Sequence, residues 1–332
     1  MHPFYFSHFR IILIKKERKL IRMNNHYYIV DSSYIIYYSA NSAFSEYIRE
    51  NDIPDRDCGP DFNPVLDNEF TYLFEKKFKR CIERPVQSII PFIDKSRYIF
   101  CLDCPRKNIW RRDIYPLYKI QRDEKDTSKD KFNIGPSFQY AYEKIIPEIC
   151  SDWGANVLKC NYAEGDDCIA VAKKYILFKN DFNKVIIISC DKDMVQLADD
   201  RTTIITSECL IRNPKKEIEH ALKSKIKEDI SASDFLLWKI IIGDKSDGIP
   251  NIKNQVGNKK AFNLLQNKDE LKKLLAEDIN TAKAFKRNKK LISLNEIPNE
   301  VENLILEELK TEVFKEDTSL EKIWPKIDLN QT

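Results

Sequence analysis

The stretch Lys184–Asp193, KVIIISCDKD, indicates the fold more clearly than any other part of this 332-residue chain. Its apolar residues are continuous rather than alternating, which is typical of a strand that is covered on both faces of a parallel sheet. Two earlier runs have the same form: HYYIVD ends at Asp31, and RYIFCLD ends at Asp103. The run KVIIISCD ends at Asp191, so each of the three predicted strands finishes in an aspartate.

Helical patterns occupy the segments between these runs, roughly at 65–83, 137–152 and 166–178. The alternation of strands and helices predicts an α/β fold with a mostly parallel, twisted sheet flanked by helices. In such sheets the functional crevice lies at the carboxyl ends of the strands. We therefore expect the three strand-end aspartates to share one edge of the sheet.

A second acidic group opens one of these helices. The segment NYAEGDDCIAVAKKY (161–175) carries Glu164, Asp166 and Asp167 within four residues. Helix capping is one explanation, because a helix N-terminus stabilises an anion by about 0.3–1 kcal/mol. Two charges about 4 Å apart repel by about 4 kcal/mol at an effective dielectric near 20, so crowding in a partly buried site indicates a nearby cation.

Beyond residue 215 the pattern becomes mostly helical and rich in lysine, and GDKSDGIPNI interrupts it. No histidine accompanies the acidic residues, since the four histidines lie at 2, 8, 26 and 220. Oxygen-only ligands suit Mg²⁺ or Mn²⁺. So many carboxylates predict two ions about 3.5–4 Å apart and a phosphodiester substrate. The predicted metal ligands are Asp31, Asp103, Glu164, Asp166, Asp167, Asp191, Asp193, Asp244 and Asp247.

Basic and aromatic residues follow Asp103 in the segment CPRKNIWRRDIYPLYKIQR (104–122). Cations bind phosphates and rings stack on bases. A solvated basic face is the alternative, but the position directly after a strand-end aspartate favours a substrate clamp. A second basic turn, QVGNKKAFNLL, opens a later helix. The predicted nucleic-acid contacts are Arg111, Arg112, Tyr115, Tyr118, Lys119, Arg122, Gly257, Lys259 and Lys260.

Composition limits the other classes. The chain is 42% hydrophobic with a net charge of +3, so attraction for nucleic acid must come from local patches. No apolar run approaches the roughly 18–20 residues that span a bilayer, so no membrane partner is predicted. Nine cysteines are an odd number, which favours free thiols and an intracellular, reducing compartment. We expect a monomer.

In their order along the chain, these motifs resemble the flap-endonuclease family of structure-specific 5′ nucleases, most closely the ribonucleases H (5′-3′ exonucleases) of T-even phages. CLDCPRKNIWRRDIYPLYKIQR is similar to the strand-end Asp and the arch that ends in Tyr-Lys-x-x-Arg. EGDDCIAVAKKY is similar to the E-x-D-D helix, IIISCDKDMVQL to the S-x-D-x-D strand end, and GDKSDGIPNI to the G-D-x-x-D that opens the helix–three-turn–helix. RNKKLISLNEIP (287–298) is similar to a segment near the end of the phage enzymes.

The resemblance implies a PIN-like nuclease core over 23–215, with a helical arch near 105–135. It implies a mainly helical DNA-binding region over 216–332, with the helix–three-turn–helix near 234–265, and residues 1–22 are expected to be a disordered extension. One departure is Gln255, which stands where the family's turn has its first glycine.

The activity implied is that of a Mg²⁺-dependent 5′-3′ exonuclease or flap endonuclease. Its substrates would be DNA or RNA–DNA duplexes with a 5′ end or flap, in primer removal, replication or repair. Lys119 and Arg122 match residues that steady the scissile phosphate, and Asp167 and Asp191 are the expected catalytic carboxylates. Two alternatives stay open: a branched-DNA-binding protein with weak catalysis, and a PIN-type single-strand RNase, which leaves Asp244 and Asp247 unexplained.

Overall fold

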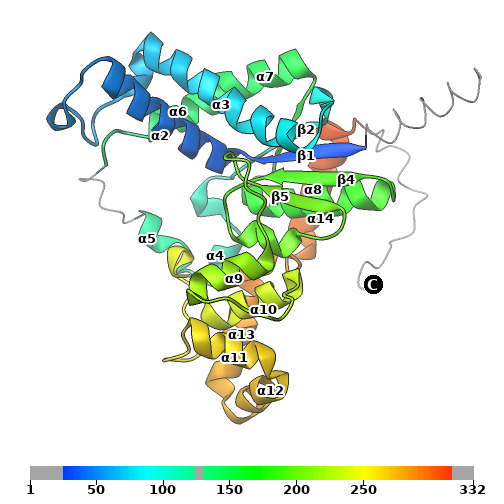
Figure 1. Cartoon of the computed structure of the whole chain (residues 1–332). Coiled ribbons are helices and arrows are strands. Elements are labelled where there is room, and N and C mark those ends of the chain that lie inside the picture. Colours follow the sequence, from blue (N-terminus) through cyan, green and yellow to red (C-terminus); the bar gives the residue numbers. More distant parts are fainter. Residues whose placement is uncertain (1–24, 124–129, 316–332) are drawn as a thin grey trace, which may run out of the picture.

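The centre of the molecule is a five-stranded parallel sheet with the strand order β3-β2-β1-β4-β5 (Figure 1). We describe residues 25–123 and 130–315 from a computed structural model of the chain. The strands are β1 (His26–Asp31), β2 (Tyr98–Leu102), β3 (Asn156–Lys159), β4 (Lys184–Ile188) and β5 (Thr202–Ile205). The predicted parallel α/β fold is confirmed. The two edge strands were not predicted, because each has only four residues and β3 is half polar.

Helices cover both faces of the sheet. One face carries α2 (Ser32–Glu50), α3 (Asn68–Ile89), α6 (Gly135–Tyr140), the π-helical turn η5 (Ala141–Ile145) and α7 (Ile146–Trp153). The other face carries α8 (Gly165–Lys179), α14 (Asn299–Glu308) and a second π-helical turn, η8 (Leu309–Val313). Alternate side chains of the central strands enter the two layers, as with Val30 on the first side and Ile29 on the second. Burial on both faces explains why these strands are apolar without interruption.

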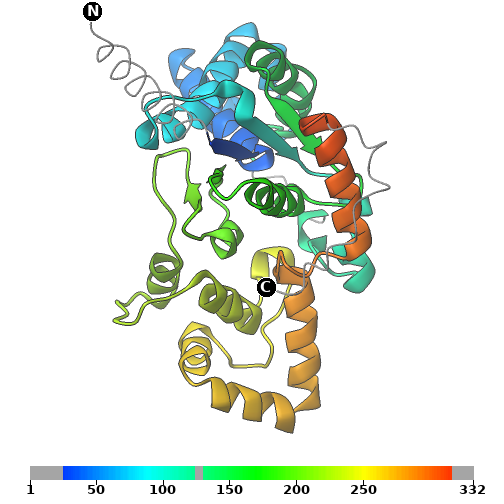
Figure 2. The ribbon, with the colours of Figure 1, turned by 90° about the vertical axis from the view of Figure 1, so that its right-hand side faces the viewer.

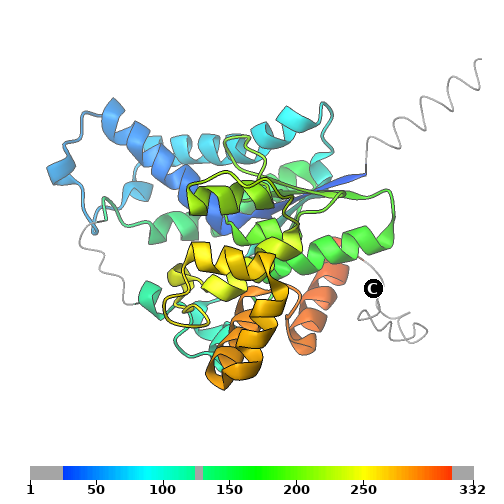
Figure 3. The same cartoon turned by 60° about the horizontal axis from the view of Figure 1, so that its bottom comes forward.

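The helices from α9 to α13 form a separate layer beyond the carboxyl edge of the sheet (Figure 2). They are α9 (Pro214–Leu222), α10 (Ala232–Ile242), α11 (Asn258–Gln266), α12 (Lys268–Glu277) and α13 (Ile279–Ile292). They enclose a hydrophobic cluster of their own, built on Phe235 and Trp238. Figure 3 brings this layer forward, with α11 to α13 in front of the sheet.

The segment that follows β2 is broken into two short helices, α4 (Arg111–Ile114) and α5 (Ile120–Asp123). Lys119 lies between them with a left-handed backbone, at a φ of 56°. The short 3₁₀ helices complete the described elements: η1 (Asp55–Asp57), η2 (Pro64–Leu66), η3 (Lys95–Arg97), η4 (Arg106–Asn108), η6 (Asp193–Leu197) and η7 (Lys245–Asp247).

The chain after α13 differs from the predicted division into a core and a DNA-binding region. Leu294, Val301 and Ile305 join the hydrophobic layer between the sheet and α8. The end of the described chain therefore packs on the sheet and α8 rather than extending the helical layer. The expected disordered extension at 1–22, part of the arch (124–129) and residues 316–332 lie outside the described residues.

Strand register brings the predicted aspartates to one edge. Asp31 pairs with Cys101, two residues before Asp103, and Val30 pairs with Ile188, three residues before Asp191. The nine cysteines are all free thiols, with Cys190 exposed. Within residues 25–123 and 130–315, no helix combines the length and apolarity needed to cross a membrane.

Candidate active site

Strand-end aspartates form the first part of the site, and hydroxyl groups and backbone amides fix their orientation. Asp31 accepts hydrogen bonds from the Ser189 hydroxyl at 2.6 Å and from the Tyr34 amide at 3.1 Å. Asp103 accepts one from the Gly165 amide, at the N-terminus of α8, at 2.6 Å and another from the Ser33 hydroxyl. Neither aspartate forms an ion pair with any cation of the described chain.

Two carboxylates of this group are destabilised in their charged form. Burial, together with the charges of Asp103 and Asp191, raises the pKa of Asp31 to about 7, although hydrogen bonds from Ser189 and Tyr34 lower it. Burial also raises the pKa of Asp166 well above its usual value, and here the neighbouring charges of Asp191 and Asp31 act in the same direction. The charge of Lys119 acts on Asp166 in the opposite direction but does not outweigh burial and repulsion.

Asp167 has a different role from the predicted one. Its side chain is fully buried and caps α8 by accepting a hydrogen bond from the Glu164 amide at 3.1 Å. Arg111 donates to both of its carboxylate oxygens, at 2.7 and 2.8 Å, and Trp110 Nε1 donates to one of them at 2.9 Å. Because both oxygens are already engaged, Asp167 is a structural residue here and not a free metal ligand.

Arg111 and Tyr118 are corrections to the predicted nucleic-acid interface. Arg111 is 2% exposed, and its Nε donates to the Leu291 carbonyl at 2.8 Å while Nη1 reaches Glu164 at 3.0 Å. Tyr118 is 3% exposed, and its hydroxyl donates to Glu164 at 2.9 Å and to Asp247 at 3.2 Å. Neither side chain is available for a phosphate or a base, because both build the support of the acidic site.

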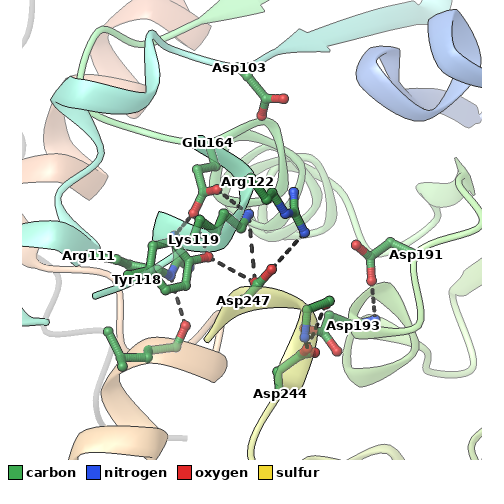
Figure 4. Close-up of polar contacts among 12 residues, drawn as sticks. Asp103, Arg111, Tyr118, Lys119, Arg122, Glu164, Asp191, Asp193, Asp244 and Asp247 are labelled. Atoms are coloured by element: carbon green, nitrogen blue, oxygen red, sulfur yellow. Dashed lines mark hydrogen bonds and ion pairs between the residues drawn. The ribbon is translucent and has the colours of Figure 1, made fainter. Parts of the chain in front are cut away.

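Lys119 and Arg122 form ion pairs with acidic residues of the site (Figure 4). Lys119 Nζ contacts Glu164 and lies 3.7 Å from Asp247, while Arg122 Nη2 lies 2.7 Å from Asp247. Although burial opposes ionisation, the charges of Lys119 and Arg111 lower the pKa of Glu164 to about 2. The Lys119 amide also donates to the Asp247 carbonyl at 2.9 Å, which ties its left-handed backbone to the GDKSD turn.

Lys239 is a site residue that the sequence analysis missed. It lies on α10, is 7% exposed, and its Nζ is 2.8 Å from Asp193 and 2.5 Å from Asp244. Burial opposes its charge, but the two aspartates raise the pKa of Lys239 above its usual value, so it is a fixed cation. The sequence indicates this residue by a single charge within the apolar run FLLWKIII. A lysine buried in such a run requires a partner of opposite charge.

The turn that carries Asp244 and Asp247 depends on a glycine. Gly243 has a φ of 69°, and a Cβ at this position would lie 2.4 Å from the Ile249 carbonyl oxygen. The Asp244 amide donates to the Ile249 carbonyl at 2.8 Å, and the Ile249 amide donates back at 2.7 Å. These bonds close the turn and direct Asp247 toward Lys119 and Tyr118.

The nine predicted ligands therefore divide into two groups. Five of them are neutralised by the chain's own cations, and four form no ion pair with any described residue. Within the described residues, no three His, Cys, Asp or Glu side chains converge closely enough to hold a metal ion as they stand. The four unpaired carboxylates nevertheless fit a divalent cation, because they offer only oxygen and repel one another in a partly buried setting. They are Asp31, Asp103, Asp166 and Asp191.

A pocket of about 750 Å³ is lined by Asp191 and Asp244 of the acidic site and by Gly257 and Asn258 of the helical layer. Lys259 and Lys260 are exposed and line an adjoining pocket of about 430 Å³. Gln255, which replaces the expected glycine, has a φ of 68°. The turn thus keeps the left-handed backbone without the residue that favours it.

Arg112 and Tyr115 are the remaining predicted contacts, and both are half-buried. Arg112 Nε donates to the Tyr118 carbonyl at 3.2 Å, and the Tyr115 ring lies under the guanidinium of Arg287, 5.2 Å away. The structure therefore places the exposed predicted cations in two separate regions. Arg122 lies at the acidic site, and Lys259 and Lys260 lie beside the second turn.

Comparison with known sequences gives a consistent result. Residues 80–230 match the family of 5′-3′ exonuclease N-terminal, resolvase-like domains. The 5′-3′ exonuclease of Mycoplasmopsis pulmonis is 30% identical over 250 residues, which cover 70% of this chain and 77% of that protein. DNA polymerase I of Bacillus subtilis is 33% identical over 149 residues, which cover 44% of this chain and only 16% of the polymerase. DNA polymerase I of Lactococcus lactis is likewise matched over only 22% of its length, so the chain spans about a fifth or less of these polymerases.

Solved structures show the same fold. T5 5′-exonuclease with bound divalent zinc ions superposes with a TM-score of 0.58 at 18% identity, over 86% of this chain and 98% of that one. A complex of the bacteriophage T5 flap endonuclease with DNA and metal ions gives a TM-score of 0.58 at 17% identity, over 88% of this chain and all of that one. At this level of identity the likeness establishes the fold.

Proposed function

This chain belongs to the 5′-3′ exonuclease family, as its sequence motifs predicted. We propose that it is a Mg²⁺-dependent nuclease that cuts phosphodiesters near the 5′ ends of DNA or RNA–DNA duplexes. One observation carries the proposal: four aspartates without an ion-pair partner lie at the carboxyl edge of the sheet and in the first turn of α8, beside Lys119 and Arg122. Carboxylates with no other ligand type favour Mg²⁺, and Mn²⁺ as its substitute.

Asp31, Asp103, Asp166 and Asp191 would hold the ions, with Ser189 and Ser33 keeping the first two oriented. When bound, two such ions activate a water molecule and stabilise the leaving oxygen of a phosphodiester. Glu164 and Asp247 hold the cations of Lys119 and Arg122 within the site. These two cations would then stabilise the negative charge that grows on the phosphate during hydrolysis.

The duplex would lie across the pocket of about 750 Å³ and reach the exposed Lys259 and Lys260. Flap endonuclease activity, a role in primer removal, replication or repair, and a monomeric state belong to the same proposal. The relatives named 5′-3′ exonuclease and the DNA-bound phage structure support it. Nine free thiols support a reducing intracellular compartment.

The test is incubation of the purified protein with a 5′-flap duplex, a nicked duplex and an RNA-primed duplex. Cleavage near the 5′ end is expected with Mg²⁺ or Mn²⁺ and none in excess EDTA. Asp191→Asn protein, purified in the same way, controls for a contaminating nuclease. Undiminished cutting in EDTA contradicts metal catalysis. Tight binding of the branched duplex without cutting indicates a branched-DNA-binding protein, and cutting of single-stranded RNA alone indicates a PIN-type RNase.

A further inference from the structure

Helix α13 has a charge pattern that its packing does not require. Its 14 residues contain five cations, Lys283, Lys286, Arg287, Lys289 and Lys290, and no acidic residue. Cations three or four positions apart on a helix repel one another and destabilise it. A helix with this pattern in a chain whose net charge is only +3 indicates that the positive charge serves another purpose.

Three of these cations lack a protein partner. Lys283, Lys286 and Lys290 are exposed and form no ion pair with any residue of 25–123 or 130–315. The neighbouring helix α12 is the contrast, because Lys268, Lys272 and Lys273 each have a carboxylate within 4 Å, in Asp234, Asp269 and Glu277 respectively. Of these two neighbouring helices, only α13 therefore presents unpaired lysines.

The outward direction of these lysines is fixed by the opposite face of the helix. Asn288 is fully buried and its side-chain amide donates to the Ile240 carbonyl at 3.0 Å and to the Pro250 carbonyl at 2.8 Å. Thr281 and Leu291 are buried on the same side. Lys283, Lys286 and Lys290, at spacings of three and four residues, therefore form one exposed row, which we call the α13 row.

The α13 row begins beside the basic segment of the acidic site. Arg287 covers the Tyr115 ring at 5.2 Å, and Leu291 accepts the hydrogen bond from Arg111. Figure 2 shows α9 and α11, which line the pocket with Lys259 and Lys260, on one side of the helical layer and α13 on the other. Helix α13 therefore lies on the other side of the helical layer from that pocket.

We propose that the α13 row binds the phosphates of the 5′ single strand, on the side of the acidic site away from the duplex; this rests on the function proposed above. A displaced 5′ strand is continuous with the duplex through the bond to be cut, so it leaves the site on the side opposite the duplex. From Lys283 to Lys290 the helix rises about 10 Å, so the three lysines can contact more than one phosphate along a strand. Tyr115 under Arg287 adds a ring and a guanidinium plane, a combination that single-strand sites use.

The test compares a triple variant, Lys283→Ala, Lys286→Ala and Lys290→Ala, with a matched control that carries Lys268→Ala, Lys272→Ala and Lys273→Ala. Binding is measured in EDTA at several salt concentrations, with a long 5′-flap duplex and with the same nicked duplex without a flap. For the flap substrate, the α13 variant should bind more weakly, and the slope of log Kd against log salt should fall by about 2. Its binding of the flapless duplex, and all binding by the control, should be unchanged.

Alanine favours helix and removes repulsion between lysines, so the α13 variant is expected to fold at least as stably as the unchanged protein. Equal weakening with the flapless duplex overturns the proposal and makes α13 a duplex contact. No change with either substrate also overturns it and leaves the row to a protein partner or to solvent. Cleavage by the unchanged protein in Mg²⁺, measured in parallel, tests the proposed nuclease function separately, because the binding assay needs no cleavage.

Discussion

Arg111 forms a bidentate ion pair with Asp167, with Nη2 donating to Oδ1 at 2.7 Å and Nη1 donating to Oδ2 at 2.8 Å. Both side chains are almost fully buried. The same guanidinium reaches Glu164 and the Leu291 carbonyl. One side chain thus joins the segment after β2, the start of α8 and the end of α13. The acidic site depends on this junction for its shape.

Removal of Arg111 should therefore destabilise the whole protein. Arg111→Ala leaves Asp167 buried without its partner, which typically costs about 3–5 kcal/mol in the free energy of unfolding. Arg111→Lys keeps the charge but loses the two-pronged geometry, so an intermediate loss is expected. Urea unfolding measures both. Arg84→Ala, at an exposed position of α3, is the control and should change stability by less than about 0.5 kcal/mol. Equal losses at the two positions contradict the assignment.

Asp191→Asn should abolish cleavage and spare duplex binding. The change removes a charge from the unpaired carboxylate group without a change in shape. We expect the single-turnover rate on a 5′ flap to fall at least about a hundredfold, with an unchanged Kd for the duplex. The exposed Asp200→Asn serves as a control with normal turnover. Near-normal cutting by Asp191→Asn would remove this residue from the catalytic group.

The raised pKa of Asp31 predicts how stability depends on pH without metal. Its carboxyl has a usual value of 3.8 and a folded-state pKa of about 7, so the folded protein binds more protons between these values. Its contribution to stability is complete below about pH 4 and is lost as the pH rises toward about 7.

Asp31→Asn keeps the shape of the protonated carboxyl and cannot lose a proton. In EDTA, the variant should gain stability relative to the unchanged protein as the pH rises from about 4 to about 7, by an amount on the order of 3 kcal/mol. Urea unfolding of both proteins at several pH values measures the difference. A difference that stays constant over this range means that Asp31 is charged throughout.

Lys119 and the pair Lys259 and Lys260 should affect different steps. Lys119 forms an ion pair with Glu164 within the acidic site. Lys119→Ala should therefore lower the rate of single-turnover cleavage at saturating enzyme by about two orders of magnitude. Lys259 and Lys260 are exposed beside the second turn, so their double alanine variant should weaken duplex binding and reduce its salt dependence. Its cleavage rate at saturation should change little. A reversed pattern means that the two basic regions have exchanged roles.

Gln255→Gly should be neutral or stabilising by up to about 1 kcal/mol, because a left-handed backbone costs an L-residue about 1–2 kcal/mol and glycine loses more entropy on folding. Gln255→Val, with a β-branched side chain at the same φ, should destabilise the protein. Thermal unfolding of both variants provides the comparison. A loss of stability with glycine shows that the Gln255 side chain itself holds the turn.

The sequence predicted the sheet because β1, β2 and β4 are buried on both faces and therefore have no polar interruptions. The edge strands β3 and β5 have only four residues each, so local pattern alone does not distinguish them from loops. Helix α2 was missed because Ile35, Ile36 and the tyrosines of SSYIIYYS also suit a strand; packing against α3 and the sheet decides the matter.

The candidate site was predicted as a list of acids and bases but not as a set of pairs. Whether a carboxylate such as Asp167 is free or engaged depends on a residue 56 positions away in the chain, Arg111. The same holds for Lys239, which bridges Asp193 and Asp244 from a helix that reads as simply apolar. Such pairings follow from tertiary packing, which residue type and spacing do not encode.

The hydrogen bonds to the segment after α13 have a consequence for the order of synthesis. Arg111 needs the Leu291 carbonyl, and the Gln196 side chain needs the Ile292 carbonyl and the Leu294 amide. Chains are made from the N-terminus and begin to fold as they emerge. When all five strands and every aspartate of the site have been synthesised, the chain still lacks the hydrogen bonds of Arg111 and Gln196 to residues 291–294. The nascent protein thus reaches its finished active site only after Leu294 has emerged.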